Sequence, residues 1–147
     1  MISNQDFDAI VNQSPGLFLP ITQHHIKSLV DKLNVEFELQ CGIYFGKSKV
    51  SCYSTTKKRI RFGAVSIERA HTAGFTEYKS LQPTLKKYTG GTRVKGLDGI
   101  TWLAMHEFSH ALQHDVFGYR RGSIHNDEFL ECYLKVISFI WEDKNHE

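Results

Sequence analysis

The apolar positions in the first third of the chain follow a helical period. Phe7, Ile10 and Val11 predict a short helix close to the N-terminus. A second and longer helix is expected after Pro20, because apolar residues recur there at helical spacing. Its apolar positions are Ile26, Leu29, Val30 and Leu33.

Between residues 37 and 67 the apolar residues no longer recur at helical spacing, and the sequence predicts three strands. They are expected over 37–45, 50–53 and 60–67, each bounded by glycine or by polar turn residues. The stretch 71–96 that follows is basic and aromatic, is interrupted by glycine and proline, and shows no clean period. We expect it to be either a mobile flap over a cleft or an ordinary long connection.

A long buried helix is predicted over 99–117. Asp98 is its expected N-cap and Gly118 its expected stop. A helix of about 19 residues is roughly 28 Å long, which is enough to cross a small domain. The apolar residues that suit a buried segment are Ile100, Leu103, Met105, Phe108 and Leu112.

A closing helix is predicted from Asn126, which is followed by Asp127 and Glu128 as acidic residues of a first turn. Together with the earlier elements it gives an α+β fold. The chain has 147 residues, of which 41% are hydrophobic, so residues 1–147 suit one domain with a sizeable core. The apolar residues of the closing helix are Phe129, Leu130, Tyr133, Leu134, Ile137, Ile140 and Trp141.

Composition favours a cytoplasmic protein, with nucleoid or nuclear association also compatible. The first residues lack the basic start and apolar run of a secretory signal, and no stretch is long and apolar enough to span a bilayer.

The three cysteines, Cys41, Cys52 and Cys132, are an odd number without CxxC spacing, which argues against a disulfide framework. We expect reduced core cysteines, with Cys41 and Cys52 as neighbours across a hairpin the alternative.

Residues 106–110 read HEFSH, an HExxH motif inside the predicted long helix. Residues four apart share one face of an α-helix, so His106 and His110 are spaced to bind one zinc ion. Glu107 is then placed to reach the water at that metal. The motif predicts a zinc peptidase with these three residues at its centre.

A catalytic zinc needs a third protein ligand, with the fourth position left to water. The metzincin class of zinc peptidases is excluded. Its motif continues from the second histidine as HxxGxxH, and Gln113 and Val116 stand where that pattern has glycine and histidine. His114 lies one turn after His110, but three histidines along a straight helix cannot all converge on one ion. His114 is therefore expected at the surface or behind the ligands.

His125 is the favoured third ligand. It follows the turn-prone stretch 118–123, where the chain is able to double back towards the motif, and it directly precedes the closing helix. Glu128 and Glu131 stay open as alternatives, because gluzincin-type sites take a glutamate from a following helix.

Basic residues are concentrated between residues 47 and 95. This segment holds twelve Lys and Arg against only Glu68 and Glu77, a net charge of +10, so the rest of the chain carries −8 to reach the overall +2. Such asymmetry, with interleaved aromatic residues for stacking, is expected of a polyanion-facing surface. DNA is therefore a candidate partner of segment 47–95. A solvated basic face over core aromatics is the alternative.

The motif and the residues after it resemble the SprT-like, or Spartan-type, metalloproteases. HEFSH, a glycine-containing turn and then HNDEF at 125–129 are similar to the HExxH and HGxxF-like segments of that family, with Asn126 in place of the usual glycine. KKRIRF at 57–62 resembles the family's basic RIRxS strand, with Gly63 in place of serine. The resemblance covers 37–141, and the zinc ribbon of some members is not present.

The resemblance implies a zincin-like fold, in which a small and mainly antiparallel sheet packs with the HExxH helix. It implies that His125 is the third zinc ligand and that the substrates are proteins bound or crosslinked to DNA. The expected reaction is peptide hydrolysis by a zinc-activated water with Glu107 as the base, and an edge strand beside the helix is expected to bind substrate as an added strand. Candidates for an additional oxyanion donor are Tyr119, Arg120, Arg121 and Tyr133.

Two other classes of function stay open. A zincin-shaped adaptor would bind metal and a nucleic acid or protein without cleaving it, and Glu107 would then be dispensable. A compact gluzincin-type peptidase unrelated to DNA would use Glu128 or Glu131 as its third ligand, and the basic segment would be incidental.

Overall fold

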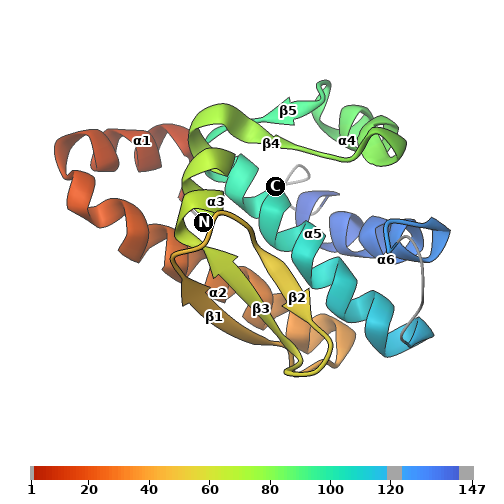
Figure 1. Ribbon diagram of the computed structural model, residues 1–147. Coiled ribbons are helices and arrows are strands. Elements are labelled where there is room, and N and C mark those ends of the chain that lie inside the picture. The colour runs from red at the N-terminus through yellow and green to blue at the C-terminus, as the bar shows by residue number, and fades with distance from the viewer. Residues whose placement is uncertain (1, 119–123, 143–147) are drawn as a thin grey trace.

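The computed structural model describes residues 2–118 and 124–142 of the chain. It combines helices with a small three-stranded sheet, which confirms the predicted α+β class. The long helix α5 crosses the centre of the molecule, with this sheet on one side and α6 on the other (Figure 1). The helices are α1 (Asn4–Gln13), α2 (Phe18–Phe37), α3 (Ala64–Arg69), α4 (Gln82–Thr89), α5 (Gly96–Phe117) and α6 (Asp127–Ile137).

Short helical turns and strands complete the described chain. Turns η1 (Pro15–Leu17) and η3 (Lys79–Leu81) are 3-10 helical, and η2 (Ala70–Gly74) and η4 (Ser138–Glu142) are π-helical. The strands are β1 (Gly42–Gly46), β2 (Cys52–Ser54), β3 (Arg59–Gly63), β4 (Phe75–Thr76) and β5 (Arg93–Val94).

The three-stranded sheet has the order β1-β3-β2 and is mixed. β1 runs parallel to β3, with Ile43 opposite Ile60, and β2 runs antiparallel to β3, with Tyr53 opposite Ile60. The prediction of a mainly antiparallel sheet is therefore wrong for its longest pairing. β4 and β5 form a separate antiparallel ribbon. β2 is an edge strand of the sheet and packs beside α5, as Figure 1 shows.

The first predicted strand begins later than expected, because α2 continues through Phe37. Glu38 ends the helix in a left-handed conformation (φ 55°). The Asn34 side chain then holds the turn, since its amide nitrogen donates to the Cys41 carbonyl and its oxygen accepts from the Cys41 N–H, both at 3.0 Å. β1 starts only after this clamp.

The third predicted strand ends at Gly63 instead of continuing to residue 67. The chain enters α3 there, with Ile67 buried and Val65 exposed. Gly63 packs against Ser48, and a Cβ at position 63 would lie 2.2 Å from the Ser48 carbonyl oxygen. Short apolar runs suit strand and helix alike, so the pattern did not distinguish the two.

Helix α5 begins at Gly96 with Lys95 as its N-cap residue, so the predicted N-cap Asp98 is wrong. Asp98 lies in the first turn and ties α5 to α1: the Asn4 amide donates to its carboxylate, and the Asp98 N–H donates to the Asn4 side-chain oxygen, both at 3.0 Å. Gly118, with φ 76°, ends α5 as predicted.

The stretch 71–96, for which the sequence predicted only a flap or a connection, is built of short elements. The β4–β5 ribbon lies over the N-terminal half of α5 (Figure 1), and α4 belongs to the connection between its two strands. Gly99 of α5 allows this contact, because a Cβ there would lie 2.3 Å from the Ala70 carbonyl oxygen and 2.4 Å from that of Val94. The ordered ribbon places its residues beside the HExxH motif.

Apolar side chains from α2, α5 and α6 form one buried cluster, in which Ile26, Trp102 and Phe129 are fully buried.

All three cysteines are free. Cys41 and Cys132 are buried as predicted, whereas Cys52 is exposed on the edge strand β2, so the expectation of a core position is wrong for it. Among the described helices, none combines the length and apolar character needed to cross a membrane.

Candidate metal centre

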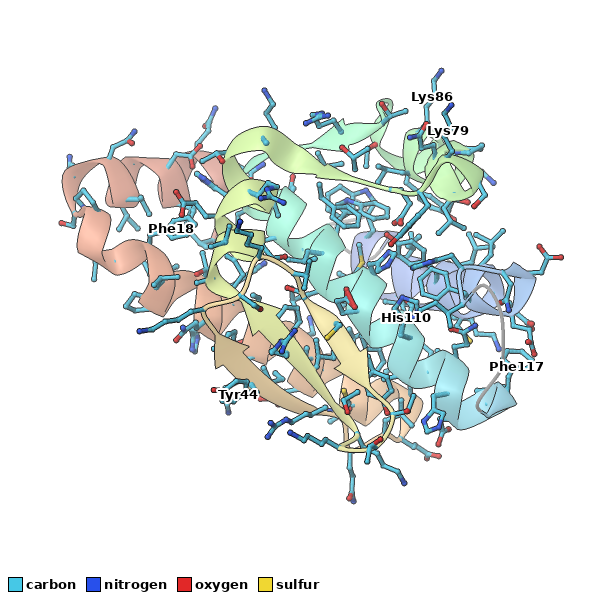
Figure 2. The ribbon with its side chains drawn as sticks, in the orientation of Figure 1. Phe18, Tyr44, Lys79, Lys86, His110 and Phe117 are labelled. Atoms are coloured by element: carbon cyan, nitrogen blue, oxygen red, sulfur yellow. The ribbon has the colours of Figure 1, made fainter. Side chains whose placement is uncertain are left out.

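Three histidine side chains converge at the middle of α5. His106 and His110 lie one helical turn apart on α5, and Figure 2 shows His110 on the side of the helix that faces α6. His125 arrives from the segment before α6, and its Nε2 lies 3.1 Å from the Nε2 of His106 and 3.1 Å from that of His110. A tetrahedral zinc with Zn–N bonds of about 2.0–2.1 Å places its ligand nitrogens about 3.3 Å apart. The observed spacing fits three ligands of one metal ion.

The other predicted ligands do not join this cluster. Within the described residues, the histidines at 106, 110 and 125 form the group whose ligand atoms all lie within 4.8 Å of one another. Glu128 and Glu131 lie on α6 outside that group. His114 is half-buried on the wall of an adjoining cavity, 6.1 Å from Tyr53 between ring centroids.

Gln113 ties the segment that carries His125 to α5. Its side-chain nitrogen donates to the Ile124 carbonyl at 3.0 Å and to the Asn126 side-chain oxygen at 3.2 Å. Its oxygen lies 3.4 Å from Nδ1 of His110. Asn126 in turn caps α6, where the sequence predicted this helix to begin, by accepting from the Phe129 N–H at 3.0 Å. One buried amide therefore fixes two ligand segments relative to each other.

Glu77 is a site residue that the sequence analysis missed. It follows β4, its side chain is fully buried, and its Oε1 lies 2.9 Å from Nδ1 of His106. A carboxylate at Nδ1 keeps the proton on that nitrogen and leaves the Nε2 lone pair for a metal. The one sequence signal was that Glu77 is one of two acids in the basic segment.

The ionisation of the cluster suits metal binding. Burial, with the charge of His106 adding to it, lowers the pKa of His110 to about 3 and that of His125 to about 4. For His106, burial opposes protonation, but the contact with Glu77 raises the pKa above its ordinary value. Neutral imidazoles are the form that binds a metal, so two ligands are already in that form at neutral pH.

Glu107 points into the same site with an unusual acidity. It is buried, and burial raises its pKa to about 7, while the neighbouring His106 lowers it and Glu77 raises it further. A carboxyl group with a pKa near neutrality both accepts and returns a proton efficiently. This is the behaviour required of the glutamate in an HExxH motif.

Aromatic rings hold the imidazoles in place. Tyr78 stacks on His125 with 3.9 Å between ring centroids, and Phe129 packs on His110 at 4.3 Å. Tyr133 meets His106 edge-on at 5.8 Å and is almost fully buried, and burial raises its pKa well above the ordinary value. The predicted oxyanion candidates 119–121 lie outside the described residues.

The site opens into a cleft made of two adjoining cavities. The first, of about 240 Å³, runs from the three histidines along β2 towards Gly118. The second, of about 490 Å³, lies towards the β4–β5 ribbon. Both cavities are lined by Ser51, Tyr78, His106 and Glu107, so they meet at the candidate catalytic residue.

Comparison with protein families, with curated proteins and with solved structures finds no match for this chain. The SprT-like resemblance therefore stays a prediction. The functional argument rests on the geometry of the histidine cluster and its surroundings.

Proposed function

We propose that the protein is a zinc-dependent endopeptidase with a zincin-like fold. The observation that carries the proposal is the convergence of three histidine Nε2 atoms beside Glu107, at the point where two cavities meet. A donor set of three imidazoles suits zinc and leaves a fourth position open.

Each residue of the site has a distinct role in the proposed hydrolysis. A zinc ion held by His106, His110 and His125 would supply Lewis acidity to the attacking water and to the substrate carbonyl. Glu107 takes a proton from the attacking water and passes it to the leaving amine, which its pKa near 7 allows in both directions. Glu77 holds the tautomer of His106, and Gln113 holds the segment of His125.

The edge strand β2 supports binding of an extended peptide. It pairs with β3 on one side, and Ser51, Cys52 and Tyr53 line the cleft along its other side. A peptide added there would gain main-chain hydrogen bonds with little demand on its side chains. This mode suits cleavage of varied, partly unfolded proteins.

DNA-associated or DNA-crosslinked proteins are the proposed substrate class. The net charge of +10 in segment 47–95 and the SprT-like resemblance support it. Lys79 and Lys86 of this segment are exposed and point away from the body of the molecule in Figure 2, where a polyanion has access to them.

Zinc analysis and cleavage assays on matched variants test the proposal. We expect one zinc per wild-type chain and none in His125→Ala, with cleavage of an unfolded protein abolished in Glu107→Gln although its zinc is retained. Zinc loss in Glu128→Ala or Glu131→Ala, with His125→Ala still loaded, would assign a gluzincin-type ligand set. Cleavage that survives in Glu107→Gln would refute the proposed mechanism.

The DNA part of the proposal is tested separately. Wild-type cleavage is measured with and without DNA, and we expect stimulation that weakens as salt is added, because phosphate contacts are salt-dependent. Full zinc loading without any cleavage, together with DNA binding, would favour the adaptor class.

A further inference from the structure

The second cavity has its own chemical character. It is lined on its outer side by Lys49, which precedes β2, by Arg69 at the end of α3, and by Arg93 at the start of β5. Because it shares its inner wall with Glu107, a group bound in it belongs to a substrate whose reacting bond lies beside that residue.

Among the described residues, the three cations have no carboxylate partner. All three are exposed. The carboxylates that line this cavity are Glu77 and Glu107 at its inner end. Glu77 is fully buried against His106, so its charge is already engaged. The outer part of the cavity is therefore open to a negatively charged group.

Arg93 is held in position along the cavity wall. Its guanidinium Nη1 donates to the Ala73 carbonyl at 3.0 Å. Its aliphatic stem crosses Gly74, whose φ is +99° and where a Cβ would lie 2.6 Å from Cγ of Arg93. A guanidinium has five N–H donors in a fixed fork, so this one bond leaves donors for a carboxylate.

We propose that this cavity is a specificity subsite that binds an aspartate or glutamate side chain of the protein substrate, on one side of the bond to be cleaved. The inference rests on the proposed peptidase function. A nucleic acid fits the cavity less well, because its phosphates would have to approach the carboxylates of Glu77 and Glu107. A single side chain reaches the outer cations without entering that inner end.

The position of the subsite along the substrate follows from strand β2. Lys49, before β2, borders the second cavity, Ser51 borders both cavities, and Tyr53 and Thr55 border the first. A peptide that pairs antiparallel to β2 places its C-terminal part at Lys49. The acidic side chain is then C-terminal to the cleaved bond.

The experiment is a cleavage-site profile of the zinc-loaded full chain on a diverse mixture of peptides, read by mass spectrometry. In the wild type we expect Asp and Glu to be enriched about fivefold at positions C-terminal to the cleaved bond, the effect of a partly exposed ion pair. Arg93→Glu is expected to remove this enrichment and favour Lys and Arg there. Lys32→Glu, an equal charge change at an exposed position of α2 outside both the cavity and segment 47–95, is the matched control and is expected to keep the wild-type profile.

Each contrary outcome has a distinct meaning. Cleavage without acidic enrichment, or enrichment that Arg93→Glu leaves unchanged, overturns the subsite and leaves the peptidase standing. An unchanged profile with weakened DNA binding assigns Arg93 to nucleic acid and also overturns the subsite. Absence of cleavage by the zinc-loaded wild type overturns both proposals. Arg69→Glu repeats the test if Arg93→Glu does not fold or load zinc.

Discussion

Replacing Glu77 by glutamine removes the charge behind His106 while keeping the shape of the side chain. The Glu77 carboxylate lies 2.9 Å from Nδ1 of His106 and its side chain is fully buried, so water cannot take over the lost role. Loss of such a partner behind a metal ligand typically weakens metal affinity by about 10- to 100-fold. The complete burial favours the upper part of that range, which corresponds to roughly 2–3 kcal/mol of zinc-binding free energy.

Competition for zinc against a chromophoric chelator measures this change, and thermal unfolding of the metal-free protein accompanies it. The unfolding measurement is needed because removing one partner of a buried pair lowers the stability of the fold by itself. Glu68→Gln, the other acid of the basic segment and exposed on α3, is the control and should bind zinc as wild type does. A folded Glu77→Gln with unchanged zinc affinity would refute the assigned role of Glu77, and a loss of stability alone would make that role structural.

Three further predictions concern the zinc affinity, the stability of the fold and its dependence on pH. Gln113→Ala is expected to weaken zinc binding about tenfold in the same competition assay, because the segment of His125 loses its tie to α5; unchanged affinity would contradict that role. Gly99→Ala is expected to destabilise the fold by at least about 1–3 kcal/mol in chemical denaturation, since its Cβ would meet backbone oxygens at 2.3–2.4 Å, whereas Gly91→Ala meets nothing within 4 Å and serves as control. The metal-free protein is expected to lose stability as the pH falls below about 6.5, as followed by its melting temperature. The folded state holds the pKa of His110 at about 3 and that of His125 at about 4, so at these two groups the unfolded chain takes up protons first. The raised pKa of Glu107 acts in the opposite direction, but one carboxyl group is outweighed by two histidines. A melting temperature that is the same at pH 7 and pH 5 would contradict this.

The metal cluster could be anticipated from the sequence in large part. His106 and His110 follow from helical spacing alone, and His125 was favoured because a turn-prone stretch separates it from α5. The Nε2 of His125 lies 3.1 Å from that of His106 and from that of His110, which agrees with that expectation. The supports could not be anticipated, because Glu77 and Gln113 act through contacts that no spacing rule describes.

The residues at which helices and strands begin and end were less predictable from the sequence than the presence of these elements. The apolar runs at 37–45 and 60–67 fit a strand, but α2 extends into the first and α3 takes the end of the second. The deciding contacts are local and specific, namely the clamp of Asn34 on Cys41 and the packing of Gly63 on Ser48. The spacing of apolar residues indicates which face of an element is buried. It does not indicate the residue at which such contacts end the element.

By itself, the sequence determined the α+β class, the long central helix, the paired histidines and the glutamate between them. These features depend on periodicity and on spacing within one element, which are properties of neighbouring residues. Only the tertiary structure decided the parallel pairing of β1 with β3, the approach of Glu77 to His106 and the cation-lined cavity around Arg93. Each of these joins separate elements, and such encounters are set by how the whole core packs.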